Sequence, residues 1–111
     1  MFFSRKEKDV KTETKQDLRK SSDKIEFAEL EDNDKQALEL VRKIKDGIPL
    51  IVNFQKLDEV TTNKFIPFFQ GAVVALDGKT VLINEDTYLF SVKDNFYDGS
   101  LKEFIESIPR Q

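Results

Sequence analysis

The side chains that carry most enzyme chemistry are missing from this chain of 111 residues, which contains no Cys and no His. Zinc-finger spacings, iron–sulfur spacings, Cys or Ser-His nucleophiles and histidine pH switches are therefore excluded. A hard-cation site would need clustered carboxylates, and the candidate clusters are Asp32 with Asp34 and Glu85 with Asp86. Helix capping and turn chemistry explain both clusters better, so the sequence predicts no metal and no cofactor. Of enzyme chemistry, only carboxylate, Lys, Tyr or Ser machinery remains open, and a carboxylate-dependent enzyme is the last of the alternatives.

Charge is divided unevenly along the chain. Of the 18 basic and 21 acidic residues, residues 1–24 hold a basic excess and residues 25–111 an acidic one. An acidic body repels phosphate, so nucleic-acid binding is disfavoured. Residues 1–24 also contain few apolar side chains with which to offset the entropy of ordering. We expect a short N-terminal tip and a disordered linker over residues 1–24, followed by one packed domain over residues 25–111.

The hydrophobic period predicts the first elements of that domain. Residues 25–30 alternate in the manner of a short, half-exposed strand. Apolar residues then recur at helical spacing over residues 34–46, behind acidic and amide side chains suited to capping, and Gly47 can end that helix in a left-handed conformation. The apolar, β-branched run at residues 49–54 is typical of a strand covered on both faces.

A second helix is expected after Asp58, which can cap it. Pro67 predicts a kink or an end near Ile66, because proline removes a backbone hydrogen bond and clashes with the preceding turn. We expect Gly71 to reverse the chain into a strand over residues 72–76.

The remaining chain predicts a three-stranded meander and a tail helix. Asp77-Gly78 fits a two-residue turn between strands 72–76 and 79–84, and Glu85-Asp86 fits the turn before strand 87–92. Residues 100–108 repeat apolar side chains at helical spacing behind a possible Ser100 cap. The expected fold class is α+β, a two-layer sandwich of order βαβαβββ. Two helices would cover one face of a mixed five-stranded sheet, leaving the other face to be shared with another chain.

Several segments resemble one family. The run Pro49-Leu-Ile-Val-Asn-Phe-Gln-Lys-Leu-Asp58 is similar to the "VVVNLQRLD" signature of the SepF family of bacterial cell-division proteins, and Phe68-Phe-Gln-Gly-Ala-Val-Val-Ala-Leu-Asp-Gly78 to that family's "FLSGTVYALGG". Tyr88-Leu-Phe-Ser matches its "FLCTP", and Phe2-Phe3-Ser4 resembles the "NFFS" that ends its membrane anchor. The similarity is colinear over roughly residues 24–105.

This resemblance implies a non-enzymatic adaptor. SepF proteins form homodimers and higher assemblies, bind the C-terminal peptide of the tubulin-like division protein FtsZ, and tether it to the membrane. The implied location is cytoplasmic, at the division site on the inner face of the cell membrane. The alternative from the residues alone is a small dimeric regulatory domain that binds a ligand without catalysis.

The resemblance also assigns residues. Gly71 matches a glycine implicated in self-assembly, although a helix-ending role with positive φ explains a glycine there equally well. Tyr88 matches a phenylalanine implicated in holding the FtsZ peptide, whereas its type and strand position alone favour a core role. Phe68 and Phe90 are expected among the neighbouring apolar residues of that peptide site. Lys64, from its position alone, is expected to supply a charge at the rim.

The N-terminal tip is the expected membrane contact. Met1, Phe2 and Phe3 would insert, and Arg5 and Lys6 would lie against anionic headgroups. From the resemblance we expect this tip to replace the family's longer anchor, so one arm should bind membrane weakly. Several arms on a dimer or a polymer would bind together.

Overall fold

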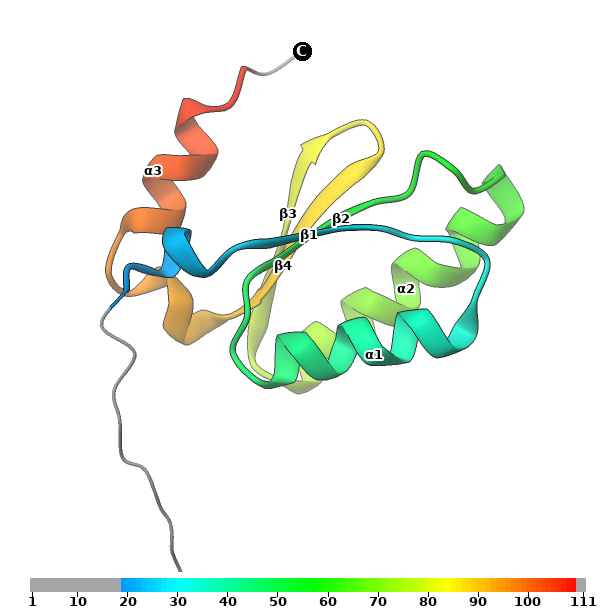
Figure 1. Cartoon of the computed structure of the whole chain (residues 1–111), viewed down its shortest axis with the longest axis horizontal. Coiled ribbons are helices and arrows are strands. Elements are labelled where there is room, and N and C mark those ends of the chain that lie inside the picture. The colour runs from blue at the N-terminus through cyan, green and yellow to red at the C-terminus, as the bar shows by residue number, and fades with distance from the viewer. Residues whose placement is uncertain (1–18, 110–111) are drawn as a thin grey trace, which may run out of the picture.

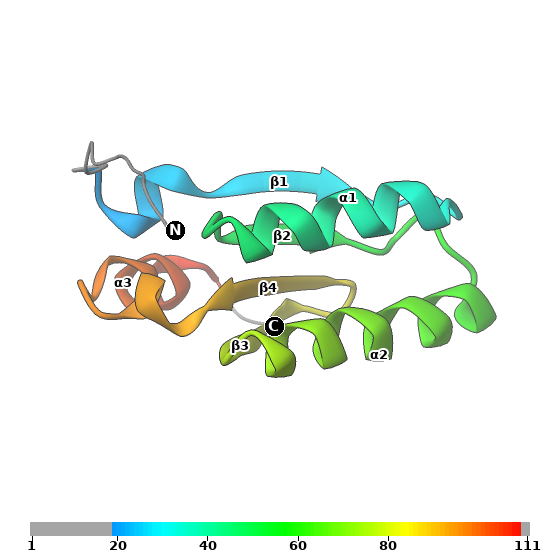
Figure 2. The ribbon, with the colours of Figure 1, turned by 90° about the horizontal axis from the view of Figure 1, so that it is seen from below.

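The computed structural model describes residues 19–109, and its four strands form one mixed sheet. The strand order is β1-β2-β4-β3; the four strands overlap in Figure 1 and follow one another in this order from top to bottom in Figure 2. The strands are β1 (Glu26–Glu29), β2 (Leu50–Asn53), β3 (Gly78–Asn84) and β4 (Thr87–Val92). β1 runs parallel to β2, whereas the β2–β4 and β4–β3 pairs are antiparallel.

Helices cover both faces of this sheet. Two long helices, α1 (Asp34–Lys45) and α2 (Glu59–Ala75), lie along one face, which we call the helix face (Figure 2). The shorter α3 (Ser100–Ser107) packs against the opposite face, which we call the far face. Two 3₁₀ helices, η1 (Ser21–Lys24) and η2 (Lys93–Phe96), lie at the end of the sheet near α3. The α+β class is therefore confirmed.

The predicted helix signals are confirmed at three positions. The Asn33 side chain caps α1 by accepting a hydrogen bond of 3.0 Å from the Gln36 amide. Asp58 caps α2 by accepting one of 2.8 Å from the Thr61 amide, and this bond lowers the pKa of the Asp58 carboxyl. Gly47 follows α1 with φ of 94°, a conformation that favours glycine.

The prediction of a fifth strand was wrong, because α2 continues through residues 72–75. Val73 lies four residues after Phe69 and is 1% exposed, so it extends the buried stripe of the helix instead of starting a strand. Pro67 does not end α2 near Ile66, because the helix continues to Ala75. Its ring is exposed, as is Asn63, so water can solvate the carbonyl that loses its partner.

Leu76 and Asp77 therefore connect α2 to β3, which begins at Gly78, and the predicted hairpin turn at Asp77-Gly78 was also wrong. Asp77 has φ of 56°. A Cβ at Gly78 would collide with the Ser91 carbonyl oxygen of β4, so glycine is required there for the close approach of two strands. The other predicted turn, Glu85-Asp86, does join β3 to β4.

Aromatic rings dominate the core on the helix face. Phe69 of α2 stacks on Phe90 of β4 with ring centroids 5.1 Å apart, and Phe54 meets both rings edge-on. All three side chains are at most 1% exposed. Ala37, Leu40 and Ile44 of α1 and Leu50 and Val52 of β2 are buried in the same cluster.

The far face carries a smaller aliphatic cluster. Ile51, Ile83 and Leu89 are buried there, and side chains of α3 and η2 pack against them. Gly99, with φ of 79°, precedes α3 and takes the cap position predicted for Ser100. η1 lies within the stretch expected to be a linker, and its Ser21 amide donates to the Asp98 carboxylate at 2.9 Å.

Candidate functional site

The two aromatic residues predicted for a peptide site on β4 have different exposure. Phe90 is fully buried beneath α2. Tyr88 is half-buried, stacks on Phe90 at 5.9 Å between centroids, and meets Phe54 edge-on at 5.7 Å. Tyr88 therefore presents part of its ring to solvent, and Phe90 supports that ring from within the core.

Leu82 of β3 is a neighbour of Tyr88 that sequence reasoning missed. The β3–β4 register pairs Leu82 with Tyr88, so both side chains lie on the helix face of the sheet. Leu82 is 49% exposed. A regular two-residue turn at Glu85-Asp86 would pair Ile83 with Tyr88, but a register shift between Leu82 and Asn84 pairs Leu82 with Tyr88 instead, so no signal in the sequence identified this partner.

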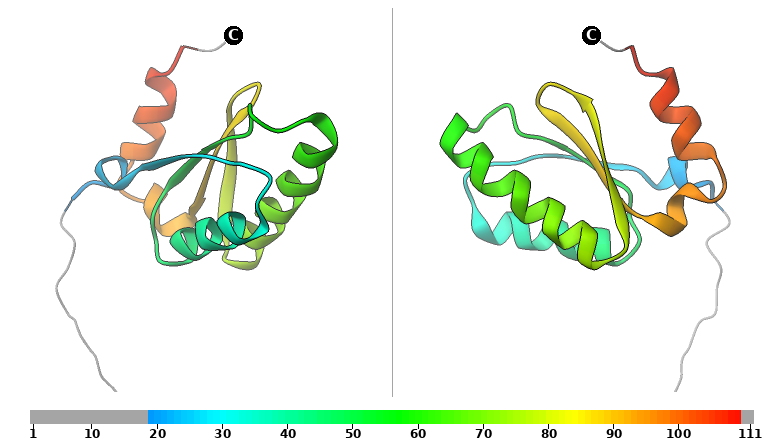
Figure 3. Two further views of the ribbon diagram at one scale, coloured as in Figure 1. Left: turned by 45° about the vertical axis from the view of Figure 1, so that its right-hand side comes forward. Right: turned by 180° about the vertical axis from the view of Figure 1, so that it is seen from behind.

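Lys64 and Phe68 lie in a different place, a groove of about 440 Å³ between α1 and α2. α1 and α2 lie side by side in both views of Figure 3. Asp34, Ala37, Leu38 and Phe65 complete the groove, and Tyr88 is not among its lining residues. The structure thus separates the predicted site residues into two surfaces.

The Lys64 ammonium is already engaged at the mouth of this groove. Its Nζ donates to the Asp34 carboxylate at 3.0 Å, and this hydrogen bond raises the pKa of Lys64. Both side chains are more than half exposed, so the pair is open to solvent and to competing carboxylates.

Gly71 lies inside α2 on its exposed side, and the predicted helix-ending role with positive φ was wrong. A Cβ built at Gly71 meets no atom within 4 Å. Glycine in a helix interior is less stable than alanine by roughly 0.5 to 1 kcal/mol. Nothing in the described part of the chain explains this glycine, whereas the close approach of a second helix would.

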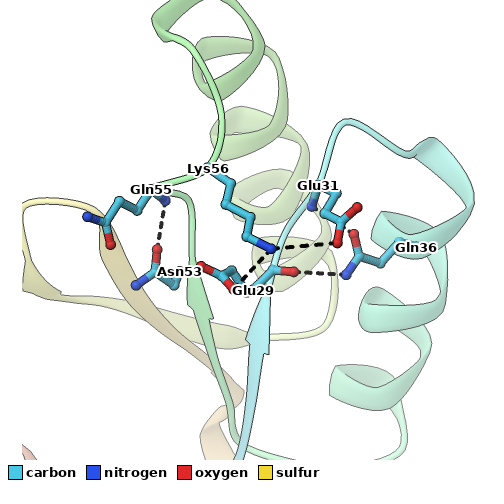
Figure 4. Close-up of polar contacts among 6 residues, drawn as sticks. All are labelled: Glu29, Glu31, Gln36, Asn53, Gln55 and Lys56. Carbon is cyan, nitrogen blue, oxygen red and sulfur yellow. Dashed lines mark hydrogen bonds and ion pairs between the residues drawn. The ribbon is translucent and has the colours of Figure 1, made fainter.

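Polar side chains order the segment that carries the first signature (Figure 4). Asn53 accepts a hydrogen bond of 2.7 Å from the Gln55 amide and so shapes the turn after β2. Lys56 lies between Glu29 and Glu31, at 3.4 and 3.9 Å from their carboxylates. These contacts join the ends of β1 and β2 at the surface.

The residues predicted to contact a membrane, Met1, Phe2, Phe3, Arg5 and Lys6, lie outside the described residues. Within residues 19–109, no helix is both long and apolar enough to cross a bilayer. The same part of the chain gathers no group of three acidic side chains that could hold a metal ion.

The family model for "Cell division protein SepF" matches residues 25–94, which include β1 to β4, α1 and α2. The chain belongs to the SepF family. The match covers well over half of the 111 residues, and it includes both signatures, Tyr88 and Gly71. SepF is a family of cell-division proteins, and the resemblance noted in the sequence is confirmed.

Similarity to individual SepF proteins agrees with this family assignment. The chain is similar to the cell division protein SepF of Natranaerobius thermophilus, with 35% identity over 66 residues, 60% of this chain and 40% of that protein. It is also similar to SepF of Carboxydothermus hydrogenoformans, 33% identical over 61 residues, which cover 55% of this chain and 44% of that one. For Caldanaerobacter subterraneus subsp. tengcongensis SepF the identity is 32% over 75 residues, 66% of this chain and 54% of the relative. The chain thus spans about half the length of these curated relatives.

Proposed function

We propose that this SepF family member is a non-enzymatic adaptor that binds the C-terminal tail of FtsZ, self-assembles, and holds FtsZ filaments at the membrane of the division site. The family match over residues 25–94 is the observation that carries this proposal. Two surfaces of the structure have properties that suit the first two activities.

The proposed contact for the FtsZ tail is the surface formed by Tyr88 and Leu82. An aromatic ring that is partly exposed and held in place by buried rings is a good anchor, because little side-chain entropy is lost on binding. Phe90 and Phe54 fix the Tyr88 ring, and Leu82 supplies apolar area beside it. In this proposal Phe90 positions Tyr88 and makes no direct contact.

Calorimetry of the full chain with the FtsZ C-terminal peptide of the same organism tests this surface. Leu82→Ser should weaken binding by about 1 to 3 kcal/mol. Leu38→Ser is the matched control, because Leu38 is 46% exposed and Leu82 is 49% exposed. If Leu38→Ser weakens binding and Leu82→Ser does not, the peptide site is the groove that contains Lys64 and Phe68.

The proposed assembly surface is the exposed side of α2. Gly71 lies there between Phe68, which is 42% exposed, and Val74, which is 73% exposed. A glycine flanked by exposed apolar side chains lets a second helix approach closely.

Gly71→Ala and Gly71→Lys separate assembly from folding. Because a Cβ has open space, Gly71→Ala should raise the free energy of unfolding by about 0.5 to 1 kcal/mol. In analytical ultracentrifugation both variants should form smaller assemblies than the wild type, Gly71→Lys most strongly. Unchanged sedimentation of Gly71→Lys would reject this surface.

The proposed membrane contact is the tip of Met1, Phe2, Phe3, Arg5 and Lys6. Inserting each Phe is worth roughly 2 to 3 kcal/mol, so a single tip should bind anionic vesicles weakly and an assembly more strongly. Vesicle sedimentation of the wild type and of Phe2→Ser/Phe3→Ser tests this contact. Equal binding of the two proteins would reject it.

A further inference from the structure

The far face contains an apolar groove that the proposed function leaves unused. It lies between the sheet and α3 and has a volume of about 650 Å³. Its apolar walls are Phe27, Ile51 and Ile83 from the sheet and Phe104 and Ile108 from α3. Phe27 is 71% exposed, so an occupant of the groove would remove a large aromatic surface from water.

A row of polar side chains closes one end of this groove. The strand registers pair Glu29 with Asn53, Asn53 with Thr87, and Thr87 with Asn84, and all four line the groove. Thr87 is only 9% exposed, and within residues 19–109 its hydroxyl has no hydrogen-bond partner.

The asparagine side chains of this row have spare donors. Asn53 and Asn84 each use the side-chain oxygen to accept from a backbone amide two residues ahead. In the described part of the chain their amide N–H groups are therefore left for an occupant. An occupant that complements the groove would therefore carry apolar side chains, followed by a small polar group and then by a cation opposite Glu29.

We propose that this groove binds residues 2–5 of the same chain. Phe2 and Phe3 would lie on the apolar walls, Ser4 at the polar row, and Arg5 beside the Glu29 carboxylate. The order of side chains in this segment matches the order of surfaces in the groove. Two steps along an extended chain cover about 7 Å, which is also the spacing between successive rows on one face of a sheet.

The connection is long enough and begins close to the groove. The Ser22 amide donates to the Ser100 hydroxyl at 2.9 Å, which fixes the start of the described chain beside α3. From there the axis of α3 leads about 12 Å to the groove residue Ile108. The roughly 16 residues from Phe3 to Arg19 would average about 20 to 24 Å as a random coil. This length exceeds the span of about 12 Å by about twofold, so the effective concentration should be in the millimolar range of short flexible linkers.

Charge favours this segment over a second copy of the far face. Glu29 is the one charged side chain that lines the described groove, and Glu85 and Asp86 follow the polar row in the β3–β4 turn. Two far faces in contact would bring these carboxylates together, which is unfavourable, whereas the segment brings Arg5 and Lys6.

Docking would withdraw Phe2 and Phe3 from any other apolar surface. A tip held in the groove is unavailable to lipid, and lipid that captures the tip empties the groove. The docking itself does not depend on the proposed membrane contact, so the two can fail separately.

Photo-crosslinking of the full chain tests the docking. Benzoylphenylalanine placed at position 3 keeps an aromatic side chain there, and after irradiation the products are separated by mass and mapped by peptide mass spectrometry. We expect products of monomer mass, with cross-links to β1, the β3–β4 hairpin and α3. Cross-links mainly to α1 or α2, or evenly over the surface, would overturn the proposal.

Matched variants test the apolar part of the groove. Phe27→Ser should lower the yield several-fold, whereas Val74→Ser on α2 should not, and the two parent side chains are 71% and 73% exposed. Both positions are exposed enough for the variants to fold. Equal yields in the two variants would overturn the proposal, as would products that have only dimer mass.

A charge exchange tests the assigned ion pair. Arg5→Glu and Glu29→Arg should each lower the yield by about 1.5- to 5-fold, the range for exposed ion pairs, and the double variant should recover it. The recovery also controls for the loss of the Glu29–Lys56 contact at 3.4 Å. Single effects that simply add in the double variant would contradict a contact between Arg5 and Glu29.

Discussion

The helix face and the far face of the sheet are packed by different means. On the helix face, two helices of 12 and 17 residues cover the strands, and three buried Phe rings contact one another. On the far face, one helix of 8 residues covers an aliphatic cluster and leaves Phe27 exposed beside a groove. Burial of apolar area is the main stabilising term, so the helix face carries most of the stability.

Polar contacts also hold η1, η2 and the start of α3 together at one end of the far face. Asp98 accepts hydrogen bonds from the Ser21 amide and from the amide and hydroxyl of Ser100. The buried Asn95 side chain donates to the Gly47 carbonyl and to the Ser91 hydroxyl, each at 2.8 Å. Such bonds are directional but individually modest in stability, so this end of the molecule should open more easily than the aromatic core.

The largest expected effect is therefore on the helix face. Phe69→Ala removes a fully buried ring that stacks on Phe90, so the free energy of unfolding should fall by about 3 to 5 kcal/mol. Urea denaturation measures this change. Phe68→Ala, one residue away and 42% exposed, should cost only about 1 to 2 kcal/mol. Equal losses would contradict the location of the core.

How much of these two faces the sequence predicts depends on where local pattern and packing agree. β4 was predicted at its observed bounds, because its alternation is bracketed by a clear turn. The cap Asp58 was identified from residue type, and Asn33 was one of three candidates with Asp32 and Asp34, since capping is a local interaction. The C-terminal helix was also predicted, but its position on the far face depends on contacts distant in sequence.

The error in α2 shows the opposite case. A glycine before a β-branched run favours a strand locally, yet the helix continues because Val73 stays in register with Phe65 and Phe69. That register is a tertiary constraint, and because of it residues 72–75 form helix instead of the predicted fifth strand.

The prediction of the candidate site was incomplete for the same reason. Leu82 could be placed beside Tyr88, and Lys64 away from it, only when strand register and helix packing were known.

A smaller loss is expected on the far face. Leu101 of α3 is fully buried, so Leu101→Ala should cost about 2 to 3 kcal/mol, near the lower end of the range for such substitutions. Hydrogen exchange should show the difference between the faces directly. Amides of α3 should exchange faster in the variant, with those of α2 little changed.

The exposed neighbour Lys102 provides the control for that comparison, because Lys102→Ala keeps the apolar side of α3 intact. If Leu101→Ala accelerates exchange in α2 as much as in α3, the two faces unfold as one unit. The two faces would then differ in the residues that pack them but not in local stability.

The smallest expected effect is the loss of stability in acid. One carboxylate near each face has a lowered pKa: Asp98 beside α3 and Asp58 at the start of α2. Hydrogen bonds from Ser21 and Ser100 hold the pKa of Asp98 far below its usual range, and those from Thr61 lower the pKa of Asp58. A folded pKa below the unfolded value, about 3.9, means that stabilisation is present above that value and is lost as pH falls through the folded pKa. From about pH 4 downward, both contacts should therefore weaken.

More donors converge on Asp98 than on Asp58, so acid should loosen the far face more than the start of α2. Comparing amide exchange at pH 7 and pH 3, we expect Ser21, Ser22 and α3 to lose protection before α2 does.

Two variants serve as controls. Asp98→Asn should remove most of this pH dependence at Ser21, and Asp58→Asn should affect only the first turn of α2. Because both carboxylates are exposed, the shifts in unfolding midpoint should be small, and the order of local opening is the decisive readout. If α2 opens first in acid, η1 and α3 are not held by the Asp98 contacts, and the far face owes its cover to the aliphatic cluster alone.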